Sequence, residues 1–478
     1  MVVLARIAAS ALAILALLLF ACGLVGYGFD EPQGADFMIS AATMGFVAGA
    51  SRLAIAGRPG DLSRRGRLVA AVAIWITVPL ALALPLGIAA KLGPVDAVFL
   101  ATSAVTTTGA TLFANPDQLP RSIVFALCLT SWYGGALTLM TAVAVLSPSG
   151  AGGLVERPRW MGRGTSTDAG EVLADTAREV LPIYGAATLM CIAALSVAGL
   201  PPFDATCLAL SALSTGGFMP RAGGIAVYDS RMVELVLVVF MLAGATSIVW
   251  QHQLVERRWA AALQRRENFV LIAIVIGLGL AAAAVLVRAG EPNAVTRGLF
   301  VAASLVSTTG FETSPGGFGR FPVAVILLVI LIGGATFSTA GGMKLYRVGG
   351  MLVQSGRELN RLIYPHGIRP ARIGGEPYDI QRMKAIWTAF ALWVGAIFLV
   401  TVAVAATHRD FAGAYVATLA ALTNTGQVYP GGLAGGVAWP GWAALAPSAK
   451  LVAAVAMVAG RLELVALLAF VNLAFWRR

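Results

Sequence analysis

Charged residues are scarce in this sequence. Only 12% of its 478 residues are Asp, Glu, Lys or Arg, whereas a soluble domain usually carries about 25%. Hydrophobic residues make up 58% of the chain and stand in long blocks. Many blocks have about 20 residues, the length that a helix needs to cross roughly 30 Å of hydrocarbon. This composition excludes an ordinary soluble protein and predicts a polytopic integral membrane protein.

Cysteine and histidine are also rare, with four and three copies. The cysteines have no paired spacing and lie in apolar surroundings, so we interpret them as buried small hydrophobic residues. His252, His366 and His408 are far apart, and we expect them to be surface groups without a shared site. The sequence contains no HExxH motif, no CxxC pair and no glycine-rich phosphate loop. We therefore expect neither an enzyme nor a bound cofactor.

Basic residues outnumber acidic ones and give a net charge of +11. In a soluble chain this charge would suggest nucleic acid as a partner, but in a membrane protein the position of the bases matters more. They concentrate in the loop after the second apolar block, in the loops between later blocks and at the C-terminus. The positive-inside rule places these loops and both termini in the cytoplasm. We expect the lipid bilayer, and no nucleic acid, as a partner.

The loop charges and apolar blocks together predict ten membrane spans. They are Ile7–Phe29, Phe37–Gly57, Leu68–Leu92, Ser122–Leu146, Val180–Leu200, Met232–Val255, Phe269–Val287, Phe321–Leu345, Ile386–Ala406 and Ser448–Phe475.

A short polar motif recurs four times between these spans. In each copy a Thr stands directly before a Gly, and a small polar residue stands before the Thr. The copies are Thr107, Thr108 and Gly109; Ser214, Thr215 and Gly216; Thr308, Thr309 and Gly310; and Asn424, Thr425 and Gly426. Before each copy lies a segment of roughly ten residues, which as a helix would be only about 15 Å long. Such segments cannot cross a membrane, so we expect them to be re-entrant.

The repeats predict an all-α fold of four pseudo-symmetric span–pore-helix–span units around one central pore, after two extra helices. The predicted segments are two helices and a basic loop at 1–66, pore unit one at 67–150, a cytoplasmic linker at 151–178, pore unit two at 179–258, pore unit three at 259–356, a second linker at 357–384 and pore unit four at 385–478.

The four turns have the chemistry of a cation site. A half-helix that ends at mid-membrane points its partially negative C-terminus at the centre. The Gly allows backbone carbonyls to face a common axis, and rings of carbonyls replace the hydration shell of potassium in selective pores. Asp96, Asp204 and Asp410 begin three of the four short segments, where an acid suits the positive end of a helix. The alternative is that these turns merely close re-entrant loops or pack spans through small residues.

Two stretches are candidate gates. The first is Arg461, a charged residue near the middle of the final span. A charge at the bilayer centre costs roughly 2.5 kcal/mol or more, so we expect it to face protein or water. The alternative is a structural ion pair with an acid.

The second candidate gate is a run of small residues in the second span of unit three, with Gly333, Gly334, Ser338, Thr339, Gly341 and Gly342. Each Gly costs about 1 kcal/mol in a helix relative to Ala, so we expect the span to break into a flexible loop below the turns. Close helix packing is the alternative. Lys344 ends this run and is expected to extend to the cytoplasmic face.

Taken together, these motifs resemble those of the Trk/Ktr/HKT superfamily of potassium transporters, and most of all its TrkH-type pore subunits. The matching stretches are Thr106–Thr111, Ser214–Phe218, Ser307–Phe311, Thr423–Gly426, Gly333–Lys344 and Gly460–Leu464. The two extra spans favour the TrkH type over the shorter Ktr type. The fourth turn departs from the family pattern, because Gln427 stands where the family has Pro.

The resemblance implies a potassium-selective filter at the four turns, an intramembrane gating loop at Gly333–Gly342 and Arg461 as an electrostatic obstacle below the filter. Some relatives that replace the first Gly with Ser favour sodium, so Gly109 favours potassium here. The resemblance also implies a homodimer, a cytosolic nucleotide-binding regulatory ring (TrkA-like) and a bacterial cytoplasmic (inner) membrane location. The expected function is potassium uptake. The alternatives are a sodium-permeable or cation-coupled symporter of the same fold and a non-conducting membrane scaffold or sensor.

Overall fold

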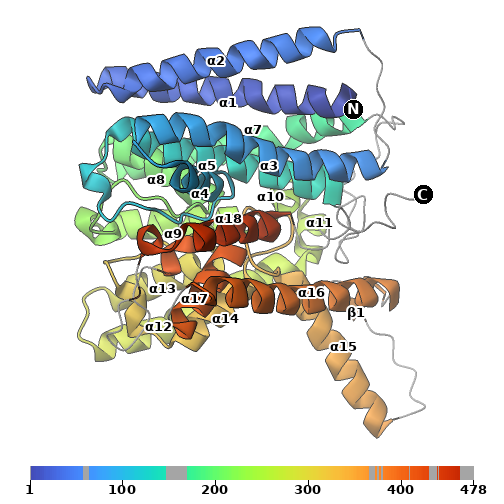
Figure 1. Ribbon diagram of the computed structural model, residues 1–478. Helices are drawn as coiled ribbons and strands as arrows, with labels where there is room; N and C mark the ends of the chain where they lie inside the picture. Colours follow the sequence, from blue (N-terminus) through green and yellow to red (C-terminus); the bar gives the residue numbers. More distant parts are fainter. Residues whose placement is uncertain are drawn as a thin grey trace.

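The computed structural model describes residues 2–57, 64–146, 169–364, 372–373, 376–377, 380–407, 410–429, 439 and 441–462. Its long helices run roughly side by side, as the apolar blocks predict, and shorter helices lie between them (Figure 1). Within the described residues the regular secondary structure is helical except for a two-residue strand pair, β1 (Arg372–Ile373) with β2 (Glu376–Pro377). The predicted all-α class is confirmed.

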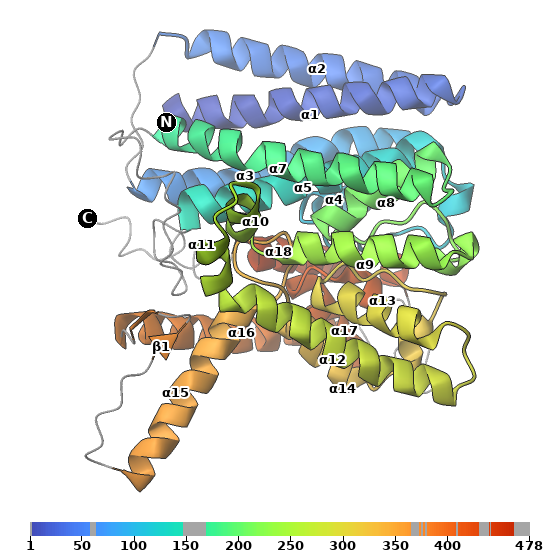
Figure 2. The ribbon, with the colours of Figure 1, turned by 180° about the vertical axis from the view of Figure 1, so that it is seen from behind.

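Two N-terminal helices form an outer layer. They are α1 (Val2–Gly28) and α2 (Gln33–Ala54), and α1 packs on α3 (Arg64–Ala89) and α5 (Arg121–Thr141). Both views show the pair on one side of the remaining helices (Figures 1 and 2). Large apolar side chains on α2, such as Phe46, remain exposed. This exposure fits a surface that faces lipid.

The rest of the chain follows the predicted plan of a long helix, a short helix and a second long segment, repeated four times. Unit one has α3, α4 (Pro94–Val105), α5 and the π-helical turn η2 (Ala142–Leu146); unit two has α7 (Ala169–Val197), α8 (Pro202–Ser214), α9 (Arg231–Ala245) and α10 (Ile248–Val255); unit three has α11 (Trp259–Gln264), α12 (Arg266–Arg288), α13 (Ala294–Val306), α14 (Val323–Ile332) and α15 (Leu345–Ile363); and unit four has α16 (Ile380–Ala405), α17 (Phe411–Leu422) and α18 (Pro447–Arg461). Short 3-10 turns in the connections are η1 (Pro116–Gln118), η5 (Ile225–Tyr228), η6 (Gly317–Arg320), η7 (Gly426–Val428) and η8 (Trp442–Ala444).

Among the described residues, seven helices are long and apolar enough to cross a membrane, and an eighth arises if α9 and α10 form one span. The predicted second span of unit three is interrupted between α14 and α15, and the helix described in the last predicted span ends at Arg461. The chain is thus a multi-pass membrane protein, and the count of ten spans stays a prediction.

The structure refines one sequence expectation here and contradicts another. The predicted span Met232–Val255 is not a single helix, because it bends by 106° between α9 and α10. The bend has a tertiary cause, because the carbonyl oxygens of Gly244 and Ala245 at the end of α9 accept hydrogen bonds from the 333–344 loop of unit three. His252 is no surface group: it is buried, and its Nε2 lies 2.8 Å from Oε2 of Glu179. The remaining two histidines lie outside the described residues.

Glycines in the second long segments let three units pack alike. A Cβ on Gly134 of α5 would overlap the carbonyl oxygen of Val105 at the end of α4. A Cβ on Gly460 of α18 would likewise overlap the carbonyl oxygen of Leu422 in α17. A Cβ on Gly244 of α9 would lie 2.9 Å from the carbonyl oxygen of Leu213 in α8. Each glycine therefore brings the C-terminus of a short helix against the helix that follows it.

Gly134→Ala is expected to destabilise the protein by about 1–3 kcal/mol, the usual cost of overpacking a tight core. The control is Gly395→Ala in α16, where an added Cβ meets no atom within 4 Å. The measurement is the thermal unfolding midpoint in detergent. Equal midpoints for the two variants would contradict the close packing at Gly134.

Candidate ion-conduction site

The four short helices α4, α8, α13 and α17 end in turns with the same unusual backbone. The residue at the head of each turn has a left-handed conformation: φ is 52° at Thr107, 55° at Thr215, 59° at Thr308 and 53° at Asn424. Asn tolerates this region, but for the β-branched Thr it is an outlier that costs of order 1–3 kcal/mol. Backbone strain that recurs at the equivalent position of three units is typical of functional sites.

Two residues later, three of the turns place a glycine at φ of 74°: Gly109, Gly217 and Gly310. This spacing changes the correspondence that the sequence suggested for unit two. The structural equivalent of Gly109 is Gly217, and Gly216 corresponds to Thr108. The helix-terminal hydrogen bonds agree, because Thr108 N–H donates to Ser103 and Gly216 N–H donates to Ser211. The four sequence motifs were aligned on their Thr-Gly pairs, and this alignment did not include Gly217 among the turn residues.

The turns touch one another in a closed cycle. A Cβ on Gly109 would lie 2.5 Å from the carbonyl oxygen of Gly216, and one on Gly217 would lie 2.6 Å from that of Thr309. The next contacts run from unit three to unit four and back to unit one: Gly310 lies against Thr425 and Gln427, and Gly426 lies against Ala110. Residues 107–109, 215–217, 308–310 and 424–426 thus form one four-turn ring.

Hydroxyl pairs fasten three of these turns to their own helices. Oγ1 of Thr108 lies 2.7 Å from Oγ1 of Thr106, and the same pairing joins Thr309 to Ser307 at 2.7 Å and Thr425 to Thr423 at 3.2 Å. In unit two the equivalent Gly216 has no hydroxyl. There, Ser131 Oγ of α5 lies 3.1 Å from Ser214 Oγ, and a Cβ on Gly216 would overlap Ser131.

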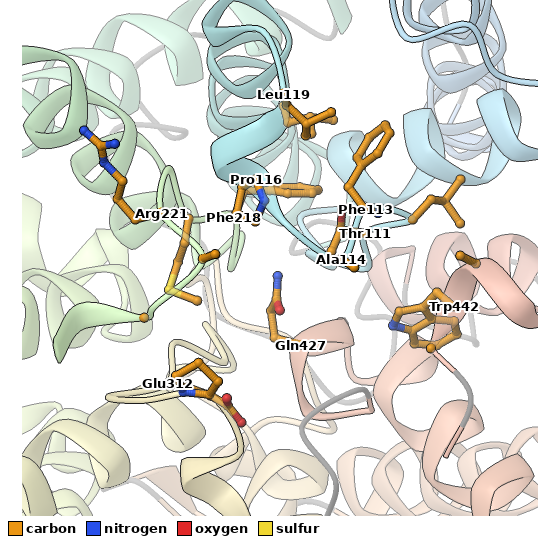
Figure 3. A pocket seen from close by; sticks show the side chains of 18 of the residues that line it. Thr111, Phe113, Ala114, Pro116, Leu119, Phe218, Arg221, Glu312, Gln427 and Trp442 are labelled. Atoms are coloured by element: carbon orange, nitrogen blue, oxygen red, sulfur yellow. Dashed lines mark hydrogen bonds between the residues drawn. The ribbon is translucent and has the colours of Figure 1, made fainter. Parts of the chain in front are cut away.

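A cavity of about 510 Å³ opens on one side of the ring. Each turn contributes a residue that follows it: Thr111, Phe218, Glu312 and Gln427. Figure 3 shows these side chains around the cavity, with Gln427 near its middle. Burial raises the pKa of Glu312 to about 7, although Gly316 N–H donates to its Oε2 at 2.8 Å. We call this space the mouth cavity.

The opposite side of the ring is covered by the 333–344 loop. The predicted break of the span is confirmed, since α14 ends at Ile332 and α15 starts at Leu345. Thr215 Oγ1 donates to the carbonyl oxygen of Thr339 at 3.0 Å, and Gly341 N–H donates to Thr308 Oγ1 at 2.7 Å. The loop is therefore bonded directly to two of the four turns.

The expectation that Lys344 extends to the cytoplasmic face is wrong. Its ammonium group turns back into the loop and donates to the carbonyl oxygen of Ala340, with Ser338 at 3.4–3.5 Å. The carbonyls of this non-helical segment need donors, and the lysine provides them.

Arg461 joins the loop to the ring. The guanidinium donates to the carbonyl oxygens of Thr106 (2.5 Å), Thr107 (3.4 Å) and Thr339, and to the hydroxyl of Thr107. The arginine is only 5% exposed. Among the described residues no carboxylate pairs with it, so the geometry there does not match a structural ion pair. The remaining space beside it, about 20 Å³, has room for about one water molecule.

Comparison with known proteins identifies the family. The family model of the TrkH cation transport proteins matches residues 37–474. The chain belongs to the TrkH family. The Trk system potassium uptake protein TrkH of Vibrio parahaemolyticus is 29% identical over 99% of this chain and 98% of that protein. That of Halomonas elongata is 32% identical over 87% and 86%. The crystal structure of the potassium transporter TrkH from Vibrio parahaemolyticus superposes with a TM-score of 0.86 at 28% identity, over 99% of both chains.

As a member of the TrkH family, the chain belongs to transporters and not to an enzyme family. The ring, the mouth cavity and the 333–344 loop thus lie in a protein whose relatives take up potassium. The first helix, α1, lies before the matched residues.

Ion pairs at the outer ends of the short helices have a structural role that the sequence did not indicate. Asp96, at the start of α4, pairs with Lys450 of α18 at 2.7 Å, and Asp204 of α8 pairs with Arg221 at 2.9 Å. The first pair links unit four to unit one. The side chain of Lys450 is only 6% exposed, so this charge depends on its partner.

Asp96→Ala is expected to lower the stability by about 2–3 kcal/mol, somewhat less than for a fully buried pair, because Lys450 is left buried without its carboxylate. Adding Lys450→Met should restore most of the loss. Asp175→Ala, which breaks the exposed pair with Arg178, serves as control and should cost about 0–1 kcal/mol. Thermal unfolding in detergent measures all three; the same midpoint for Asp96→Ala and Asp175→Ala would contradict a linking role.

Proposed function

We propose that this chain takes up potassium through the four-turn ring, which acts as a selectivity filter. The observation that carries the proposal is the closed cycle of contacts between the four turns. Four helix C-termini directed at one place favour a cation without a carboxylate. Backbone carbonyls at a common axis replace the water around a potassium ion. The relatives with this fold are potassium uptake proteins.

The proposed potassium ligands are carbonyl and hydroxyl oxygens of the predicted turn residues, with Gly217 added. They are Thr107, Thr108 and Gly109; Ser214, Thr215, Gly216 and Gly217; Thr308, Thr309 and Gly310; and Asn424, Thr425 and Gly426. The proposed gate consists of Arg461 and the loop residues Gly333, Gly334, Ser338, Thr339, Gly341 and Gly342. In this arrangement the small pocket beside Arg461 leaves no room for a hydrated ion, so the gate is closed.

The wider arrangement belongs to the same proposal. The mouth cavity faces the outside of the bacterial inner membrane and the basic loops and both termini face the cytoplasm, which the positive-inside rule supports. We keep the predicted division into two leading helices, four pore units and two cytoplasmic linkers at 151–178 and 357–384. The partners proposed are a second copy of the chain and a cytosolic nucleotide-binding ring of the TrkA kind, as the name of the Trk system of its relatives suggests.

Expression of the chain in a potassium-uptake-deficient bacterium, with its cognate cytosolic ring, is expected to restore growth and potassium uptake at low external potassium. Flux assays with and without sodium or proton gradients separate uptake through a pore from coupled transport. Equal permeation of sodium and potassium would favour the sodium-permeable alternative. No uptake of either ion, with normal membrane insertion, would favour a scaffold or sensor.

Arg461→Ala is expected to raise potassium leak by about tenfold or more. A single charge-assisted hydrogen bond contributes about 1.5–3 kcal/mol, and this change removes bonds to both the ring and the loop. The matched control is Arg178→Ala, because Arg178 is an exposed residue of α7. Flux into proteoliposomes measures the leak. Leak equal to that of the unmodified protein, with normal folding, would refute a gating role for Arg461.

A further inference from the structure

The carbonyls of the first turn accept all their described hydrogen bonds from unit four. Arg461 donates to Thr106 and Thr107 at the loop side of the ring. Further along the turn, Gly426 N–H donates to the carbonyl oxygen of Thr108 at 2.6 Å. The last carbonyl, that of Gly109, accepts from Nε2 of Gln427 at 2.8 Å. Each of these four consecutive carbonyl oxygens, from Thr106 to Gly109, thus accepts a hydrogen bond from unit four.

The fourth turn has the backbone that makes this possible. Gly426 lacks the positive φ of the other three corner glycines and instead begins the 3-10 turn η7. Its carbonyl oxygen accepts a hydrogen bond from the indole Nε1 of Trp442 at 2.9 Å, which holds that oxygen against the protein. The resulting fold of the chain directs the next side chain, Gln427, into the mouth cavity (Figure 3).

Gln427 spans the ring at the mouth. Its Cβ lies 3.0 Å from the position of a Cβ on Gly310, and its Cγ lies equally close to that of Gly217. With its amide on Gly109, this one side chain contacts the corner glycines of the other three units.

We propose that Gln427 is a latch at the mouth of the ring, an uncharged donor that occupies the carbonyl of Gly109 in the place of an alkali cation. This proposal rests on the proposed potassium uptake. A carbonyl oxygen has two lone pairs, but a donor N–H and a cation on the same side of it repel each other. In the proposal, a cation that enters from the mouth cavity therefore displaces the side chain. The latch therefore raises the concentration of external potassium at which the outermost position fills, and Gln427 sets the apparent affinity.

Two variants separate the effect of the hydrogen-bond donor from the effect of the size of the side chain. Gln427→Met keeps the length of the side chain but removes the donor, and Gln427→Glu replaces the amide by a carboxylate that attracts cations. The matched control is Gln118→Met, because Gln118 is exposed on η1, beside the mouth cavity but not in its lining. Each is expressed with the cognate cytosolic ring in a potassium-uptake-deficient bacterium, so that the mouth faces the medium.

The measurement is the half-saturating external potassium concentration for uptake, together with inhibition by sodium. A neutral hydrogen bond has a net value of about 0.5–1.5 kcal/mol, so Gln427→Met should lower the half-saturating concentration by about twofold to tenfold. Gln427→Glu should lower it at least as far, and Gln118→Met should leave it unchanged. Should one Gln427 variant not reach the membrane, the other decides.

Unchanged half-saturation in the Gln427 variants that reach the membrane would overturn the latch. If Gln427 only supports the shape of the ring, its loss would instead increase inhibition by sodium and leave the half-saturating concentration at or above its original value. Both outcomes leave potassium uptake by the unmodified protein intact. Absence of uptake by the unmodified protein would contradict the proposed function itself and the latch with it.

Discussion

The structure depends on the contact between four strained turns that must meet in one closed cycle. Each turn holds its first residue in the left-handed region, and three of these residues are threonines that rarely adopt it. Such strain persists only where the surroundings determine it fully. Here the hydroxyl pairs fix the turns from behind, and the glycines of α5, α9 and α18 allow the following helices to press against the short helices.

The four units share this geometry at the ring but differ in the segments around it. The residues proposed to gate the ring and to act at its mouth belong to these differing segments. Unit three interrupts its second span with the 333–344 loop, and unit two bends between α9 and α10 to provide carbonyls for that loop. Unit four supplies Arg461 and Gln427, which bond to unit one from opposite sides of the ring. A strictly fourfold molecule would lack these contacts, which bring unit-four side chains to both sides of the ring.

Local patterns in the sequence predicted the features that depend on local physics. The repeated Thr-Gly motif located the ring, the short apolar segments indicated the four short helices, and the cluster of glycines indicated the break between α14 and α15. The register of unit two was missed because Gly216 and Gly217 are adjacent in the sequence, and they are distinguished by the positive φ of Gly217 and by the hydrogen bond of Gly216 N–H to Ser211. The bend after Ala245 results from contacts with the distant 333–344 loop, and the inward turn of Lys344 depends on the non-helical path of that loop; periodicity and composition record neither.

The central claim is that the four-turn ring removes water from a monovalent cation. The most direct measurement is anomalous X-ray diffraction from crystals of the full chain soaked in rubidium or thallium, which replace potassium. The account predicts peaks on the axis of the ring, within coordination distance of oxygens from residues 107–109, 215–217, 308–310 and 424–426. Ordered cations found only outside the ring, with none on its axis, would contradict it.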